Sequence, residues 1–255
     1  MPALSSEEIA FLKRTAQEDL DYHARQFEQE YRSTIHLSRF LKTLPGFTGG
    51  EALDVACGAG ANIYHLAREL TGYRWMGLDI AGSVVFPIGR PKLAAAGLDV
   101  TLVEGDFFRL GEIFAGRRFD LVLFMQSLLL VPGYGELLEE LLAVTKGWLV
   151  FTGLFTDFHV DARVEVRDYT WSADCQGPFS YNVWSLSRFR ESCEARGCRE
   201  FVSRDFEIDI DLPRPASGGM GTYTDRLPDG RRLQFTGPSL MPWKFVAVRA
   251  PGSAR

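Results

Sequence analysis

The chain has 255 residues and a formal net charge of −5, with 28 Lys and Arg against 33 Asp and Glu. This length fits one α/β domain with insertions, which buries roughly 70–75% of its extended surface and needs no metal or disulfide to hold a core. The acidic balance gives no support to a large basic face, so nucleic acid is not expected as a partner.

The cysteines and the apolar stretches favour an intracellular protein. Four cysteines, at positions 57, 175, 193 and 198, match no common zinc spacing, so we expect reduced thiols and no metal site. The first residues lack the pattern of a signal peptide, and the most apolar segment, 119–131, is too short and too often interrupted to span a bilayer. We therefore expect a cytoplasmic protein without a membrane partner.

The first predicted element is a helical region. Apolar side chains recur every three or four residues over 5–42, and Pro45-Gly46 ends this pattern. Strands and helices then alternate as far as residue 154. The strands are predicted at 51–56, 73–79, 99–104, 119–125 and 147–153, and the helices at 61–70, 82–96, 108–114 and 134–145. Such alternation with apolar strands predicts a parallel sheet that is covered by helices on both faces.

The alternation stops after residue 154. Residues 155–184 are rich in aromatic side chains and have no clear period. A helix is predicted at 185–196, and a strand-like run at 200–210 leads into a Pro- and Gly-rich stretch. Tyr223–Leu227 and Arg232–Thr236 flank a tight turn and are predicted as a hairpin, with a last strand at Phe245–Val248.

A glycine turn follows the first predicted strand, in the sequence Asp54-Val55-Ala56-Cys57-Gly58-Ala59-Gly60. Gly60 can adopt backbone angles closed to other residues, and Gly58 lets the main chain approach a ligand. The helix that follows directs unpaired N–H groups at the same place. This arrangement predicts a site for a nucleotide-like cofactor, which Asp54 either contacts or supports by bracing the turn.

The residues after the turn distinguish between cofactors. A dinucleotide site favours a small residue where this chain has Ile63, and no lysine follows the glycines as in a P-loop. The second strand ends at Asp79, 19 residues beyond Gly60, where a carboxylate can accept hydrogen bonds from ribose hydroxyls. The third strand leads into Gly105-Asp106-Phe107, where an acid can accept from an exocyclic amine and an aromatic ring can cover adenine.

Taken together, these motifs resemble the class I S-adenosylmethionine-dependent methyltransferases, in order, over nearly 100 residues from Asp54 to Val150. The resemblance implies a Rossmann-like, doubly wound α/β fold with a mostly parallel seven-stranded sheet, an antiparallel last strand and helices on both faces. It also implies S-adenosylmethionine as cofactor and S-adenosylhomocysteine as product. We expect one domain, with a helical cap at 1–45, a cofactor-binding core at 46–154, and insertions at 155–184 and 211–240 that form the acceptor site or a lid.

In that family the glycine turn lies under the methionine portion, the acid matching Asp79 holds the ribose, and the acid matching Asp106 meets the adenine. The segment matching Met125 and Gln126 faces the sulfonium and the acceptor, and an early helix folds over the cofactor. The expected cofactor-binding residues are Tyr31, Asp54, Ala56, Cys57, Gly58, Gly60, Asp79, Ile80, Gly105, Asp106, Phe107, Met125 and Gln126.

The acceptor is expected among the segments outside the sheet. Their aromatic side chains suit a planar or cationic substrate, or else pack on one another as a lid. The candidates are Tyr22, His36, Tyr169, Trp171, Tyr181 and Trp184. If the reaction uses a base, His159 is the first candidate because it follows the fifth strand at the expected mouth of the site. Further candidate bases are His36, His23, Glu165 and Asp168.

The sequence favours a small organic acceptor. The run Met125-Gln126-Ser127-Leu128 is not the Asn/Asp-Pro-Pro-Tyr/Phe loop of methyltransferases that act on nucleic-acid adenine, and no Pro-Cys nucleophile marks a cytosine-C5 enzyme. We expect O- or N-methylation, with C-methylation as an alternative, by a monomer or homodimer. Two other classes stay open: an NAD-dependent oxidoreductase, disfavoured by Ile63 and by Asp106-Phe107, and a non-catalytic S-adenosylmethionine-binding regulator of the same fold.

Overall fold

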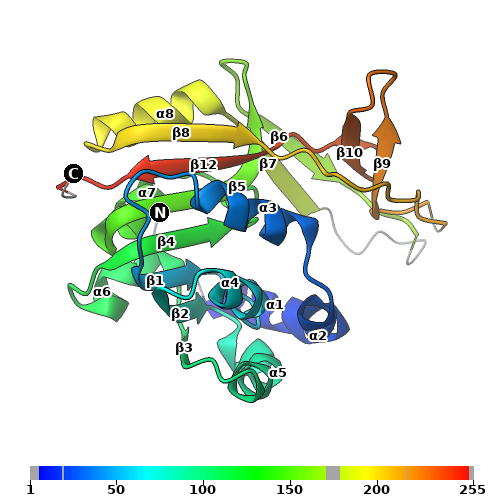
Figure 1. Cartoon of the computed structure of the whole chain (residues 1–255). Helices are drawn as coiled ribbons and strands as arrows, with labels where there is room; N and C mark the ends of the chain where they lie inside the picture. Colours follow the sequence, from blue (N-terminus) through cyan, green and yellow to red (C-terminus); the bar gives the residue numbers. More distant parts are fainter. Residues whose placement is uncertain (1–5, 19, 171–178, 217, 253–255) are drawn as a thin grey trace.

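A mixed sheet forms the centre of the molecule (Figure 1). The computed structural model describes residues 6–18, 20–170, 179–216 and 218–252. Seven strands follow the order β3-β2-β1-β4-β5-β12-β8. Their bounds are β1 Gly50–Val55, β2 Tyr73–Asp79, β3 Val100–Glu104, β4 Phe119–Met125, β5 Thr145–Thr156, β8 Arg199–Asp205 and β12 Trp243–Arg249. β1 to β5 pair in parallel, and β12 is antiparallel to both of its neighbours. The Rossmann-like fold with an antiparallel last strand is confirmed.

Two further strands extend this sheet, so the described sheet has nine strands and not the expected seven. β7 (Phe179–Ser185) pairs in parallel with the end of β5, and β6 (Ala162–Val166) pairs antiparallel with β7. Both lie in a segment for which the sequence predicted no element. Val164 and Val166 alternate with charged residues, which is the period of a half-buried strand, but five residues are too few for that pattern to stand out.

Helices cover both faces of the sheet, as expected (Figure 1). One face carries α1 (Ser6–Glu18), α2 (Leu20–Glu28), α3 (Arg32–Leu41), α4 (Ala61–Glu69) and α5 (Gly82–Ala95). The other carries α6 (Leu110–Phe114), α7 (Gly135–Ala143) and α8 (Leu186–Ala195). The predicted N-terminal helical region therefore consists of the first three of these helices.

The inner strands contribute to two apolar cores, one on each face. Leu53 and Val55 of β1 pack with α6 to α8, whereas Ala52 packs with the helices on the opposite face. Successive side chains of a strand point to opposite faces, so a strand covered on both sides is apolar throughout. Asp54 of β1 departs from this pattern, since it is an acidic residue whose side chain is completely buried.

Two glycines on neighbouring elements let the glycine turn fit against the sheet. A Cβ on Gly77 of β2 would lie 2.7 Å from Cys57 Sγ and 2.9 Å from Ile63 Cδ1. A Cβ on Gly89 of α5 would lie 1.8 Å from the carbonyl oxygen of Ala59. The missing side chains make room for the bulky Ile63 and bring α5 directly onto the turn.

A second, three-stranded sheet is formed by residues 222–240 and projects from the molecule in Figure 1. β9 (Thr222–Arg226) and β10 (Arg232–Thr236) form the predicted hairpin, and β11 (Ser239–Leu240) pairs with β10. The strand predicted at 200–210 is shorter and ends at Asp205. Across the described residues, no helix combines the length and apolar character that crossing a bilayer requires.

Candidate functional site

A cavity of about 820 Å³ opens at the carboxyl ends of β1, β2 and β4, where ligands bind in open α/β sheets. One side, the sheet wall, is made by residues that follow the strands: Ala56, Cys57, Gly58, Asp79, Ile80, Ala81, Phe107, Phe108, Met125 and Gln126. The opposite side, the helical wall, is made by α1 and α2: Leu12, Thr15, Ala16, Tyr22, His23 and Gln26. Asn62 and the loop after β4 complete the lining, the loop through Ser127, Leu130, Val131 and Pro132.

The backbone of the sheet wall is held in unusual conformations. Ala56 and Gln126 have φ angles of +59° and +55°, a region that residues with a side chain rarely adopt. Gly58 and Gly60 also have positive φ, at +55° and +90°. Strained backbone concentrates at functional sites, because the surrounding structure must hold it. Of the four non-glycine residues with positive φ in the described parts of the chain, Ala56 and Gln126 lie where β1 and β4 end at the cavity, and the other two lie outside its lining.

Asp79 is bound to the glycine turn by its own carboxylate. Its Oδ2 accepts a hydrogen bond from Gly58 N at 2.8 Å, and its Oδ1 accepts from Ala81 N at 2.8 Å. Burial raises the pKa of Asp79, opposed by these two N–H donors and by the nearby His23. A carboxylate has about four acceptor positions, so Asp79 retains capacity to accept hydrogen bonds from a ligand in the cavity.

Asp54 lies behind the turn and does not line the cavity. Its side chain is fully buried, and neither carboxylate oxygen has a hydrogen-bond partner within the described parts of the chain. Burial, reinforced by the charge of Asp79, raises the pKa of Asp54 to about 8. A raised pKa of about 8 means that the folded protein favours the protonated, neutral form of Asp54 at neutral pH.

The segment after β3 contributes one of its predicted residues to the cavity. Phe107 lines it, whereas Asp106 is 7% exposed, and its Oδ1 accepts a hydrogen bond from Phe108 N at 2.9 Å. Gly105 is not a lining residue, and a Cβ there would lie 2.7 Å from Ile113 Cδ1. Gly60 and Tyr31 also lie outside the lining.

Of the expected acceptor residues, the structure brings Tyr22 alone to this cavity, among those it describes. His36 Nε2 lies 3.3 Å from Asp209 Oδ2, and Arg32 Nε donates to Asp209 Oδ1 at 2.6 Å. Tyr181 is buried in an apolar cluster. Trp171 lies outside the described residues.

His159 is not in the lining, and its Nδ1 lies 2.9 Å from Ser187 Oγ at the start of α8. His23 is the one histidine of the described chain that lines the cavity, and a Cβ on Gly58 would lie 3.3 Å from its Nδ1. The helical periodicity over 5–42 predicted a helix in this region, but periodicity does not tell which side chains of the helix line a cavity.

β7 fixes the loop that follows β4. Asn182 donates from its backbone N to Leu129 O at 2.8 Å and from Nδ2 to Val131 O at 2.8 Å. Trp184 Nε1 donates to Leu128 O at 3.0 Å. Trp184, which was expected to contact the acceptor, is not in the lining and instead helps to position the loop that borders the cavity.

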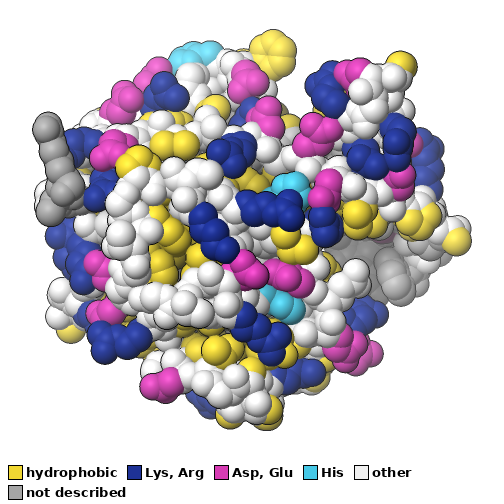
Figure 2. Space-filling model, in the orientation of Figure 1, with side chains coloured by type: hydrophobic (Ala, Val, Ile, Leu, Met, Phe, Trp, Pro, Cys, Tyr) yellow, Lys and Arg dark blue, Asp and Glu magenta, His cyan; other side chains and the backbone are white. Residues whose placement is uncertain are grey.

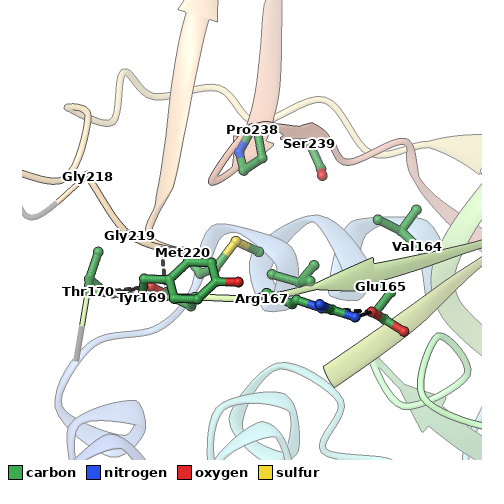
Figure 3. A pocket seen from close by; sticks show the side chains of 12 residues that line it. Val164, Glu165, Arg167, Tyr169, Thr170, Gly218, Gly219, Met220, Pro238 and Ser239 are labelled. Atoms are coloured by element: carbon green, nitrogen blue, oxygen red, sulfur yellow. Dashed lines mark hydrogen bonds and ion pairs between the residues drawn. The ribbon is translucent and has the colours of Figure 1, made fainter. Parts of the chain in front are cut away.

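A smaller pocket of about 410 Å³ lies between the end of β6 and the second sheet (Figure 3). Tyr169, which is 61% exposed, and the ion pair of Arg167 with Glu165 lie along one side. Asp168 accepts hydrogen bonds from Thr170 and from Met220 N. Glu165 and Asp168, the carboxylate alternatives for a base, therefore lie in this pocket and not in the larger cavity.

The chain is similar to known methyltransferases in sequence and in fold. Residues 52–147 match the family model of a methyltransferase domain. The chain is 25% identical over 241 residues to phthiotriol/phenolphthiotriol dimycocerosates methyltransferases of Mycobacterium tuberculosis and Mycobacterium bovis, covering 91% of this chain and 85% of theirs.

Two solved structures share the fold. One is the magnesium protoporphyrin IX methyltransferase of Synechocystis with bound S-adenosylmethionine, with a TM-score of 0.59, 12% identity, and coverage of 98% of this chain and 99% of that one. The other belongs to a complex of a methyltransferase activator with a putative methyltransferase of Haloferax volcanii, with a TM-score of 0.60, 18% identity, and coverage of 94% and 97%.

Proposed function

Because the chain belongs to the class I S-adenosylmethionine-dependent methyltransferases, we propose that it methylates a small organic molecule, at oxygen or nitrogen or alternatively at carbon. The observation that carries this proposal is that one cavity brings Gly58, Asp79 and Phe107 together with Met125 and Gln126. The mycobacterial relatives are methyltransferases of phthiotriol and phenolphthiotriol dimycocerosates, which supports an organic acceptor.

The sheet wall has the chemistry that an adenosyl cofactor requires. Gly58 presents bare backbone to the cavity, Asp79 offers carboxylate oxygens as acceptors for ribose hydroxyls, and Phe107 offers an aromatic face for adenine. The cofactor, S-adenosylmethionine, supplies a methyl group on a sulfonium and leaves as S-adenosylhomocysteine. In this assignment Met125 and Gln126 border the reacting atoms, because they end the neighbouring strand β4.

His23 is the base in this proposal when the acceptor is a hydroxyl. It lines the cavity beside Asp79, whereas His159 is engaged by Ser187. A hydroxyl holds its proton until attack, so a positioned base accelerates the reaction. His23 takes that proton, and the cavity excludes water from the reacting atoms.

The proposed partner is a small molecule, with no nucleic acid and no membrane, and the proposed location is the cytoplasm. Figure 2 shows Lys and Arg side chains interspersed with Asp and Glu over the face it presents, which is unlike the single-charge surface that nucleic acids favour. The proposed assembly is a monomer or a homodimer.

Ligand-dependent unfolding tests the proposal. S-adenosylhomocysteine at 100 times its Kd should stabilise the protein by about 2.7 kcal/mol, and NAD at the same concentration should not. Asp79→Ala should abolish this stabilisation, whereas the matched carboxylate variant Asp229→Ala, in the β9–β10 turn, should keep it. Stabilisation by NAD and not by S-adenosylhomocysteine would contradict the methyltransferase assignment and favour an oxidoreductase. Transfer of labelled methyl to any member of a panel of phenols, amines and sugars would exclude a non-catalytic role.

A further inference from the structure

Three exposed apolar side chains stand at the mouth of the cavity. Leu12 is 36% exposed, Tyr22 is 37% exposed and Leu130 is 62% exposed, and all three line the cavity. Leu12 and Tyr22 come from the helical wall, and Leu130 comes from the loop after β4. Large apolar side chains that gather around a hollow mark a surface for an apolar partner or ligand.

The position of Leu130 is fixed by the fold. The carbonyl groups of Leu128, Leu129 and Val131 all accept hydrogen bonds from β7, and Leu130 N donates to Ser127 O at 3.0 Å. The loop is therefore anchored on both sides of Leu130. The exposure of this leucine is a property of the folded loop and does not arise from a loose segment.

The described lining of the cavity offers no Lys or Arg to pair with an anionic acceptor. Among the described residues that line it, Asp79 is the one carboxylate, and none is Lys or Arg. Asp79 is held by Gly58 N and Ala81 N on the sheet wall. Lys13, next to Leu12 in the sequence, pairs with Glu104. Burying a charged group without a partner costs several kcal/mol or more, so an anionic acceptor is disfavoured.

The volume leaves room for two molecules. Ligand pockets commonly measure about 300–1,000 Å³, and this cavity of about 820 Å³ lies in the upper part of that range. A cofactor on the sheet wall leaves the side between the helical wall and Leu130 for the acceptor.

We propose that the acceptor is an uncharged, apolar molecule whose reactive group enters the cavity while its apolar body lies between Leu12, Tyr22 and Leu130. This inference rests on the proposed function, because the same cavity is assigned to the cofactor. The apolar side chains at the mouth then determine which acceptor binds, and the sheet wall binds the cofactor.

Binding of a defined series of probes tests this inference. Neutral 4-alkylphenols with chains of one to seven carbons, and the anionic 4-heptylbenzoate, are titrated calorimetrically into the protein saturated with S-adenosylhomocysteine. Affinity should rise by up to about fourfold for each added methylene, and 4-heptylbenzoate should bind at least tenfold more weakly than 4-heptylphenol. Leu130→Asp should weaken 4-heptylphenol at least tenfold, whereas Leu240→Asp, a matched change of an exposed leucine in β11, should leave its affinity unchanged.

The outcomes separate the two proposals. Failure of S-adenosylhomocysteine to bind wild-type protein would overturn the proposed function. Normal binding of S-adenosylhomocysteine, combined with phenol affinities that ignore chain length or with equal effects of Leu130→Asp and Leu240→Asp, would overturn the apolar acceptor alone. Light scattering could also show a wild-type dimer that dissociates in Leu130→Asp. That result would assign the mouth of the cavity to contact with a second copy of the chain and would overturn the inference of an apolar acceptor.

Discussion

The two walls of the cavity are built differently. The sheet wall rests on buried groups and main-chain hydrogen bonds: Asp54 is inaccessible, and Asp79 is fixed by Gly58 and Ala81. The helical wall is half exposed and is fastened through side chains, by the ion pair of Lys13 with Glu104 and by the contact of His65 Nε2 with Gln26 O at 2.8 Å. The proposed function assigns the cofactor to the buried, hydrogen-bonded sheet wall and the acceptor to the more exposed helical wall.

The largest effect is expected from the buried acid of the sheet wall. The pKa of Asp54 is raised to about 8, so the folded protein keeps its proton between about pH 4 and 8 while the unfolded chain releases it. This contribution to stability is complete below about pH 4 and declines as the pH rises to 8, by up to about 4 kcal/mol between pH 5 and 8. Urea unfolding at pH 5 and pH 8 should show a smaller decline in the free energy of unfolding for Asp54→Asn than for the wild-type protein. Equal declines would mean that Asp54 is ionised in the folded protein.

A second test concerns the packing of α5 on the glycine turn. Gly89→Ala places a Cβ against the backbone oxygen of Ala59, which cannot move without shifting the turn. We expect a loss of about 3 kcal/mol or more in the free energy of unfolding. Gly133→Ala has open space around its new Cβ and should change stability by less than about 0.5 kcal/mol. Similar values for the two variants would show that the turn is not rigidly supported.

On the helical wall, the most sensitive side chain should be His23. His23→Gln removes the proposed base, and kcat with a hydroxyl acceptor should fall about 100-fold, or about 2.7 kcal/mol in the activation barrier. Steady-state kinetics should show no comparable change for His159→Gln, since His159 lies outside the cavity. A fall in kcat for His159→Gln and none for His23→Gln would instead identify His159, the first candidate from the sequence, as the base.

The smallest effect is expected at the ion pair that fastens α1. Lys13 and Glu104 are both about a third exposed, at 32% and 38%, and exposed ion pairs contribute less than about 1 kcal/mol. Lys13→Ala should therefore weaken S-adenosylhomocysteine by no more than about fivefold in calorimetry. A loss as large as that of Asp79→Ala would show that the two walls act as one unit.

The same contrast explains what the sequence could predict. The strands, the glycine turn and Asp79 follow from local patterns, because buried parallel strands are apolar throughout and a strand-to-helix turn needs glycine. Tyr181 and Trp184 could not be placed, because an aromatic residue suits a core as well as a ligand site, and the pairing of β7 with β5 depends on residues far apart in the chain. His23 and Leu130 line the same cavity only because the rest of the fold positions α2 and the loop after β4.

Diffraction from crystals grown with S-adenosylhomocysteine tests the central claim most directly. The account predicts density for the adenosyl group along the sheet wall, with both ribose hydroxyls within hydrogen-bond distance of the Asp79 carboxylate and the adenine ring against Phe107. Density for the ligand in the smaller pocket beside Tyr169, or in the cavity with the ribose turned away from Asp79, would contradict it.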